Sequence, residues 1–211
     1  MIELPYIPES FSGSVKKNDN CKVIAIAAST GGTDAIEEIL KSLPKDIAPI
    51  VIVQHIKAGF TNVFAQHLDQ VCNIQVKEAA NGDMLKRGLA LIAPADLHMK
   101  VNWRTGYLIS ECFVGKRIHG VMPAADILFN SVANTMGKMA IGIILTGMGV
   151  DGAVGIKQMR DKGAKTIGQN EETCVVYGMP KAAREMGGLD FVLPLKKIPD
   201  MILYLLNSES P

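Results

Sequence analysis

The 211-residue sequence has few aromatic residues, no dominant charge and no paired cysteines. Because aromatic residues make up only 5% of the chain, aliphatic side chains must build most of the core. Lysine and arginine (22) almost balance aspartate and glutamate (21), so the chain lacks the positive field that draws proteins to nucleic acid or anionic membrane surfaces. The four cysteines form no CxxC pair and have no histidine at ligand spacing, which argues against a zinc site or a disulfide framework. We therefore expect neither a metal nor nucleic acid as a partner.

Long hydrophobic runs and the pattern of a secretion signal are also absent from the sequence. The first ten residues carry acid and proline where a signal peptide has a positive end and an apolar run. The longest nearly apolar stretch, Met139 to Leu145, is much too short to cross a bilayer. Scattered cysteines are typical of a reducing compartment. Together these features predict a cytoplasmic protein that does not insert into a membrane.

Short β-branched runs alternate with helical periods along most of the chain. Residues 1 to about 20 mix Pro, Ser, Gly, Lys and Asn, which predicts a flexible lead-in before one domain over 21–207. The alternation predicts an α/β fold, a doubly wound and mostly parallel sheet covered on both faces. From about 74 to 111, short strand candidates separated by Gly, Asn and Pro predict a β-hairpin-rich insertion. The other expected strands are 23–27, 49–53, 140–145, 165–169 and one near Phe191, and the expected helices include 61–71, 124–136, 152–162, one opened by Pro180 and 197–206.

A hydroxyl follows the first expected strand. Ser29 comes directly after the buried run, and Gly31 and Gly32 let the backbone turn tightly into a helix. Ligands of parallel sheets gather at the carboxyl ends of the strands, where helix amides favour developing negative charge. Ser29 is therefore a candidate nucleophile on a turn that replaces the G-x-S-x-G elbow. A simple helix cap and a phosphate cradle are the alternatives.

An imidazole follows the second expected strand. His55 lies just past Val53, a position that suits a general base better than a helix face does. His67 falls within an expected helix, and His98 and His119 lie in the insertion and its exit loop without a recognisable constellation. A lone histidine is weak evidence, so the role of His55 depends on a partner.

A carboxylate lies in the glycine-rich turn after a later strand. Asp151 precedes an expected helix, where an acidic N-cap is a frequent alternative. The same turn, Gly147-x-Gly149-x-x-Gly152, also matches a dinucleotide-binding fingerprint, with Glu171 or Glu172 about twenty residues further on. Against that hypothesis, Asp151 would place a negative charge beside the pyrophosphate.

Ser29, His55 and Asp151 each follow a separate strand of one expected sheet. A hydroxyl nucleophile needs a base, and the base needs an acid that fixes its tautomer and stabilises the imidazolium. The backbone N–H groups of Met148 and Thr30 are candidates for binding the oxyanion. The pattern therefore predicts a serine hydrolase with a Ser-His-Asp triad, while spacing alone leaves open whether the three side chains meet.

Ordered sequence blocks run from about residue 22 to 207. They are Ile26-Ala27-Ala28-Ser29-Thr30-Gly31-Gly32, Val53-Gln54-His55, Gly59-Phe60-Thr61, Ile92-Ala93-Pro94, Leu97-His98-Met99, Asp126-Ile127-Leu128-Phe129, Ile144-Leu145-Thr146-Gly147-Met148-Gly149, Asp151-Gly152, Gln169-Asn170-Glu171 and Cys174-Val175-Val176-Tyr177-Gly178-Met179-Pro180. In these blocks the chain resembles the catalytic domain of the chemotaxis receptor methylesterases, the protein-glutamate methylesterase family called CheB.

This resemblance implies a three-layer α/β domain and a specific reaction. Such a domain hydrolyses γ-glutamyl methyl esters on the cytoplasmic helices of methyl-accepting chemoreceptors and releases methanol, and many members also deamidate receptor glutamines. The family's nucleophile, base and aspartate fall on Ser29, His55 and Asp151. Its threonine falls on Thr30, and the methionine whose N–H helps to bind the oxyanion falls on Met148. The resemblance implies no metal or other cofactor.

The chain departs from the family pattern in two places. Typical members carry an N-terminal receiver domain, whereas about twenty residues precede the domain here, so we expect either a fragment or a stand-alone form, with a receiver domain or kinase acting in trans as a further partner. The family's Arg-His-Arg-Pro-Ser run is replaced by Gly120-Val121-Met122-Pro123-Ala124, with Lys116 and Arg117 just upstream. The lost positive charge leaves open a triad hydrolase with a different ester or amide substrate. A dinucleotide-binding module is the least favoured hypothesis.

Overall fold

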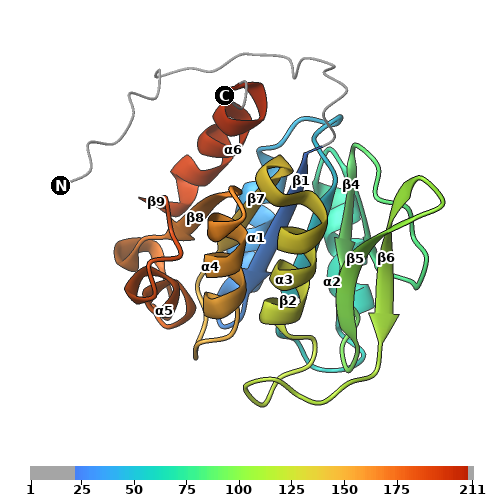
Figure 1. Ribbon diagram of the computed structural model, residues 1–211, viewed down its shortest axis with the longest axis horizontal. Helices are drawn as coiled ribbons and strands as arrows, with labels where there is room; N and C mark the ends of the chain where they lie inside the picture. Colours follow the sequence, from blue (N-terminus) through green and yellow to red (C-terminus); the bar gives the residue numbers. More distant parts are fainter. Residues whose placement is uncertain (1–21, 209–211) are drawn as a thin grey trace.

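A seven-stranded parallel sheet runs through residues 22–208, the part of the chain that the computed structural model describes (Figure 1). The lead-in expected over residues 1 to about 20 lies outside the described residues. Every neighbouring pair of strands in this sheet is parallel. In spatial order the strands are β3 (Gln75–Glu78), β4 (Leu89–Ile92), β2 (Ile50–Gln54), β1 (Val23–Ala28), β7 (Ala140–Ile144), β8 (Lys165–Gln169) and β9 (Phe191–Leu193).

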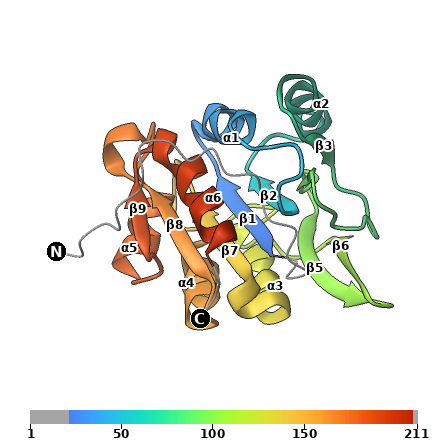
Figure 2. The same ribbon diagram turned by 90° about the horizontal axis from the view of Figure 1, so that it is seen from above.

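Helices cover both faces of the sheet, which confirms the expected three-layer α/β fold. Figure 2 shows α1 and α2 on one side of the strands and α3 and α4 on the other. The first face carries α1 (Gly32–Lys41), α2 (Thr61–Val71) and α6 (Ile198–Asn207), and the second carries α3 (Ala125–Met136), α4 (Ala153–Asp161) and α5 (Met179–Glu185). Three short 3₁₀ turns, η1 (Gly137–Met139), η2 (Glu171–Thr173) and η3 (Leu195–Lys197), join some of these elements.

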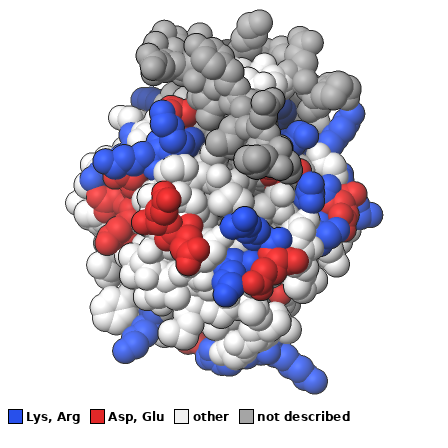
Figure 3. All heavy atoms as spheres, turned by 90° about the vertical axis from the view of Figure 1, so that its left-hand side faces the viewer, with Lys and Arg blue, Asp and Glu red and all other residues white. Residues whose placement is uncertain are grey.

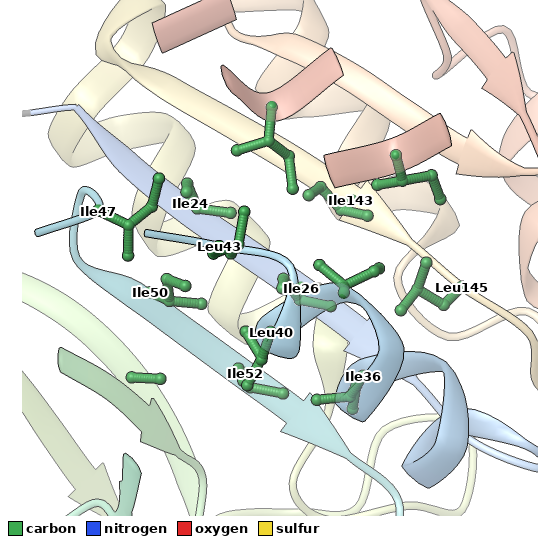
Figure 4. Packing of buried hydrophobic residues seen from close by; sticks show 14 of the residues in the cluster. Ile24, Ile26, Ile36, Leu40, Leu43, Ile47, Ile50, Ile52, Ile143 and Leu145 are labelled. Atoms are coloured by element: carbon green, nitrogen blue, oxygen red, sulfur yellow. The ribbon is translucent and has the colours of Figure 1, made fainter. Parts of the chain in front are cut away.

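The central strand β1 is apolar at every position because it packs against both helical layers. All six of its residues are buried. Ile24 and Ile26 join the core beneath α1, whose helical spacing brings Ile36 and Leu40 to the same cluster (Figure 4). The alternate residues of β1 belong to the core beneath α3 and α4. A continuous apolar run is the pattern of a strand buried on both faces.

The expected hairpin-rich insertion over about 74–111 is correct for only part of that range. The hairpin consists of β5 (His98–Arg104) and β6 (Tyr107–Phe113), which pair antiparallel. The strand candidates before it, β3 and β4, are instead parallel strands at the edge of the main sheet. The connection between them contains no helix, and Leu85 in that connection donates its N–H to Leu108 of the hairpin at 2.8 Å. Because this crossover lacks a helical period, the sequence resembles a run of hairpins there.

The hairpin is fastened to α3. Val101 of β5 accepts from the Thr135 hydroxyl at 3.1 Å and donates its N–H to Ser131 Oγ at 2.9 Å. Apolar residues of the hairpin, Met99 and Leu108 among them, join the core on that face of the sheet. The loop from β6 to α3 therefore leaves a fixed hairpin and enters a fixed helix.

Charged side chains of both signs are interspersed on the face shown in Figure 3, in keeping with the balanced composition. Among the described residues, no helix combines the length and the apolar character that crossing a membrane requires.

Helices α3 and α4 approach closely at Gly155. A Cβ atom built there would lie 2.7 Å from Phe129 Cβ and 3.0 Å from the carbonyl oxygen of Asp126. The Gly155 N–H donates to Asp126 Oδ1 at 2.7 Å. The two helices therefore need a residue without a side chain at this contact.

We predict that Gly155→Ala destabilises the domain although alanine favours helices. Intrinsic propensity would add about 1 kcal/mol of stability, but forcing a methyl group between packed helices costs about 1–3 kcal/mol. The measurement is the free energy of unfolding in urea. Val154→Ala, at an exposed position of the same helix, serves as control and should change stability by less than about 0.5 kcal/mol. A Gly155→Ala protein as stable as the wild type would contradict the close packing of these helices.

Candidate active site

Ser29 and His55 lie at the carboxyl edge of the sheet on adjacent strands. Strands β1 and β2 pair in parallel with Ala28 opposite Gln54, and Ser29 and His55 are the next residues along each strand. The His55 N–H donates to the carbonyl of Ala28 at 3.1 Å, which extends the hydrogen-bond ladder between β1 and β2 by one residue. The register itself therefore places the candidate nucleophile beside the candidate base.

This edge is also where the winding of the sheet reverses. From β1 the chain proceeds through β2 to one edge of the sheet, then returns to β7 on the other side of β1. The turn after β1 leads into α1 on one face, and the turn after β7 leads into α4 on the opposite face. In such folds, ligands usually bind at the strand ends where the connections diverge in this way.

Several contacts fix the backbone at Ser29, whose side chain is half-exposed. Its N–H donates to Thr146 at 3.0 Å, and its carbonyl accepts from the Gln54 amide at 2.9 Å. The same Gln54 amide donates to the His55 carbonyl at 3.1 Å. At Gly147 an added Cβ would lie 2.7 Å from Ser29 Cβ, so only glycine allows this approach. Gln54 and Gly147 thus hold Ser29 and His55 at fixed backbone positions.

The structure brings His55 and Asp151 into direct contact. His55 Nε2 lies 2.9 Å from Asp151 Oδ2, with side chains 13% and 3% exposed. The tautomer protonated on Nε2 donates to the carboxylate and leaves Nδ1 as a free acceptor. In the familiar serine-protease triad the two nitrogens have the opposite roles. Within residues 22–208 no hydrogen bond joins the Ser29 hydroxyl to the ring, so nucleophile and base are neighbours without a formed bond.

The Asp151 carboxylate lies at the N-terminus of α3. Besides His55 it accepts the N–H of Ala125 at 2.7 Å and of Asp126 at 3.2 Å. These are first-turn amides of α3, which have no partner within the helix, and the positive end of the helix dipole favours a negative charge there. A buried carboxylate is thereby satisfied on both oxygens. The sequence did not reveal this role of α3, since Ala125 and Asp126 lie 26 and 25 positions from Asp151.

The candidate oxyanion donors Met148 and Thr30 lie on the turns that follow β7 and β1. The Met148 side chain is 70% exposed, and Thr30 is exposed as well. Among the hydrogen bonds of the described residues, neither backbone N–H has an acceptor. The Thr30 carbonyl accepts from the Thr146 hydroxyl at 3.0 Å, which ties one turn to the other. Two amides are thus available to a ligand at this edge of the sheet.

A second histidine–carboxylate pair, which sequence patterns did not indicate, lies next to Asp151. His119 Nε2 is 3.0 Å from Asp126 Oδ2, and the other Asp126 oxygen accepts the Gly155 N–H. Ligand atoms of His119, Asp126 and Asp151 fall within 4.8 Å of one another, which is spacing that a cation could use. Backbone N–H groups and the two imidazoles already bind these carboxylate oxygens, so the cluster is satisfied as a hydrogen-bond network.

The described cysteine thiols are poor nucleophiles. Burial raises the pKa of Cys72, Cys112 and Cys174 to about 11 in each case. Cys174 lies near the site, where its Sγ is 4.0 Å from the carbonyl of Gln169. Because the thiolate is the reactive form, these residues do not compete with Ser29 for the role of nucleophile.

The doubly wound sheet, with hydroxyl, imidazole and carboxylate gathered where its winding reverses, defines the class of the protein as a three-layer α/β domain with a candidate active site at its switch point. A family model described as CheB methylesterase matches residues 24–202. The chain therefore belongs to the CheB methylesterase family.

Individual relatives agree with this assignment. A protein-glutamate methylesterase/protein-glutamine glutaminase 2 from Syntrophomonas wolfei is 49% identical over 185 residues, which cover 88% of this chain and 54% of the relative. A protein-glutamate methylesterase/protein-glutamine glutaminase from Sulfurimonas denitrificans is 50% identical over 188 residues, 89% of this chain and 53% of the relative. The chain thus spans about half the length of the curated relatives it matches.

Among solved structures, the catalytic domain of Thermotoga maritima CheB methylesterase has a fold similar to that of this chain. It superimposes with a TM-score of 0.85 at 39% sequence identity, and the match covers 87% of this chain and 98% of that chain. The described part of this chain therefore matches nearly the whole of that solved domain.

We predict slow alkylation of Cys72, Cys112 and Cys174 by iodoacetamide. At pH 7.5 a thiol whose pKa is about 11 holds roughly a hundredfold less thiolate than one with a pKa of 9. Mass spectrometry of the labelled peptides, with glutathione as an internal reference, measures each rate. The rates should keep rising as the pH approaches 11. Labelling of any of the three at the glutathione rate would contradict this prediction.

Proposed function

We propose that this domain hydrolyses γ-glutamyl methyl esters of chemoreceptors with Ser29, His55 and Asp151 as its catalytic triad. The observation that carries the proposal is the 2.9 Å contact between His55 and the buried Asp151, beside Ser29 on the neighbouring strand. The names of the relatives, protein-glutamate methylesterase/protein-glutamine glutaminase, support a glutamyl ester or amide as substrate.

The first half of the reaction forms an acyl-enzyme. His55 Nδ1 takes the Ser29 proton while Ser29 Oγ bonds to the ester carbonyl carbon, and Asp151 stabilises the imidazolium through Nε2–H. The carbonyl oxygen becomes an oxyanion that the N–H groups of Met148 and Thr30 bind. The C–O bond to the methoxy group then breaks, and His55 protonates the departing oxygen, so methanol leaves.

The second half restores the enzyme. His55 takes a proton from water, whose oxygen attacks the acyl-enzyme carbonyl, and the same amides bind the second oxyanion. Collapse breaks the bond to Ser29 Oγ, which recovers its proton from His55, and the product is a glutamate carboxylate. A glutamine side chain undergoes the same steps with ammonia as leaving group, so deamidation is a second activity of this site.

The proposed substrate also determines which partners and which cellular compartment we expect for this domain. The ester lies on the cytoplasmic helices of methyl-accepting chemoreceptors, so we infer that the domain works in the cytoplasm and does not enter the bilayer. A receiver domain or kinase, joined to this domain or acting in trans, is the regulatory partner we propose.

The two alternatives have less support. In the dinucleotide hypothesis the turn from Gly147 to Gly152 would face a pyrophosphate, but Gly147 is packed against Ser29 and Asp151 is bound to His55 and α3. A different ester or amide substrate is the stronger alternative. Val121 and Met122 line a cavity beside His55, so this altered loop contributes to what the domain accepts.

We predict that Ser29→Ala abolishes methanol release from a methylated chemoreceptor cytoplasmic fragment. Without the hydroxyl no acyl-enzyme forms, and the rate should fall by at least about 10⁴-fold. The melting temperature should stay close to that of the wild type, since the Ser29 contacts seen here are made by its backbone. Ser42→Ala, at the far end of α1, is the matched control and should keep full activity. Near-native release by Ser29→Ala would refute the mechanism.

We predict that Asp151→Asn lowers kcat by about 10³- to 10⁴-fold with a much smaller change in KM. An amide in place of the carboxylate no longer stabilises the imidazolium, a loss confined to the transition state. Steady-state kinetics on the same receptor fragment separates the two constants. Asp34→Asn, in the exposed first turn of α1, is the control for removing one carboxylate charge near a helix start. If kcat of Asp151→Asn stays within tenfold of the wild type, Asp151 is not part of the triad.

A further inference from the structure

A cavity of about 350 Å³ opens beside His55. Its wall combines residues that follow β2, one residue of the loop from β4 to β5, and residues of the loop from β6 to α3. The lining includes His55, Lys57, Asp96, Arg117, Val121 and Met122. A substrate that presents its ester to His55 therefore meets both charged and apolar side chains in this cavity.

The loop that contributes Arg117 and Met122 is a tight hairpin. Ile118 and Val121 exchange two backbone hydrogen bonds of 3.1 and 2.9 Å. The two residues between them have positive φ angles of 52° and 79°, the pattern of a two-residue type I′ turn. Arg117 and Met122 directly flank this bridge, so the hairpin fixes their backbones side by side.

His98 clamps both ends of the same loop. Its ring is fully buried, with Nε2 donating to the carbonyl of Lys116 at 2.9 Å and Nδ1 accepting the Ala124 N–H at 3.2 Å. The tautomer protonated on Nε2 satisfies both contacts. The loop that carries Arg117 is therefore held in place by defined hydrogen bonds, although it contains no regular secondary structure.

Charged groups in the wall are incompletely neutralised. Arg117 Nη2 bonds Asp96 Oδ1 at 2.8 Å, and both side chains are 54% exposed. The Asp96 N–H donates to Met122 at 3.3 Å, which holds Asp96 against the loop. The single hydrogen bond to Asp96 uses only one of the five N–H donors of the Arg117 guanidinium group. Lys57 forms no salt bridge within residues 22–208. Donors and net positive charge thus remain available beside His55.

We propose that Arg117 is a specificity-determining residue that binds a carboxylate next to the scissile ester, and that Asp96 holds Arg117 and weakens this binding by competing for it. The preferred substrate is then an acidic peptide segment in which the glutamyl ester has neighbouring glutamates. Val121 and Met122 provide apolar surface for aliphatic parts of the segment. This inference rests on the proposed function of the site.

Opposite effects of two substitutions follow from this arrangement. Arg117→Gln removes the cation, whereas Asp96→Asn removes the anion that competes with the substrate. On a methylated receptor fragment with neighbouring glutamates, Arg117→Gln should raise KM about three- to tenfold, and Asp96→Asn should lower it by a smaller factor. The kcat values should stay within about twofold, because neither residue touches the reacting atoms.

The experiment compares that fragment with one whose neighbouring glutamates are replaced by alanine, because glutamine would itself be a substrate of the proposed deamidation. Lys116→Gln is the matched control, since it removes one positive charge next to Arg117 at a residue outside the cavity lining. The KM effects of Arg117→Gln and Asp96→Asn should disappear on the alanine fragment, and Lys116→Gln should leave KM unchanged on both fragments. Thermal melting verifies that each variant is folded.

Three results would overturn the inference. The first is an unchanged KM in Arg117→Gln. The second is a rise in the KM of Arg117→Gln that is equal on both fragments. The third is a rise in the KM of Asp96→Asn as large as that of Arg117→Gln, which a purely structural ion pair would produce. Failure of the proposed function looks different. In that case the wild type and Ser29→Ala release equal amounts of methanol from both fragments, whatever stands at position 117.

Discussion

The parallel pairing of β1 with β2 and β7 is the constraint on which the rest of the structure depends. It sets Ala28 opposite Gln54 and Ala27 opposite Ile144, so the turns after all three strands emerge at one edge. Pairing of this kind requires apolar side chains on both faces of β1 and helices over both. The same requirement that makes the core apolar therefore gathers the polar residues where the strands end.

Asp151 connects this edge to the second helical layer. Its carboxylate binds His55 and also the first amides of α3, and α3 is in turn packed against α4 through Gly155. A buried charge is tolerated only when hydrogen bonds satisfy it. The position of α3 is for this reason a condition for the orientation of His55, and the packing of α3 on α4 at Gly155 bears on the proposed chemistry.

One segment links the proposed chemistry to the proposed selectivity. The loop clamped by His98 carries Arg117 at one end and reaches Ala124 at the other, and α3 begins at the next residue. The cavity wall and the support of Asp151 are therefore continuous in the chain. The hairpin also contacts the helix start directly, because His119 Nε2 lies 3.0 Å from Asp126 Oδ2, so a change in this loop bears on the residues that support Asp151 as well.

Sequence alone determined the fold class and the strand ends at which Ser29, His55 and Asp151 lie, because burial on both faces of a sheet leaves a periodic apolar pattern that local residues carry. It did not determine the parallel pairing of β3 with β4, since their connection lacks a helix. Nor did it reveal the amides of α3 behind Asp151, the clamp made by His98, or the pairing of Arg117 with Asp96. Those contacts join residues 18 to 26 positions apart, either through backbone groups or between side chains of separate loops. They leave no residue pattern in the sequence and exist only once the layers have packed.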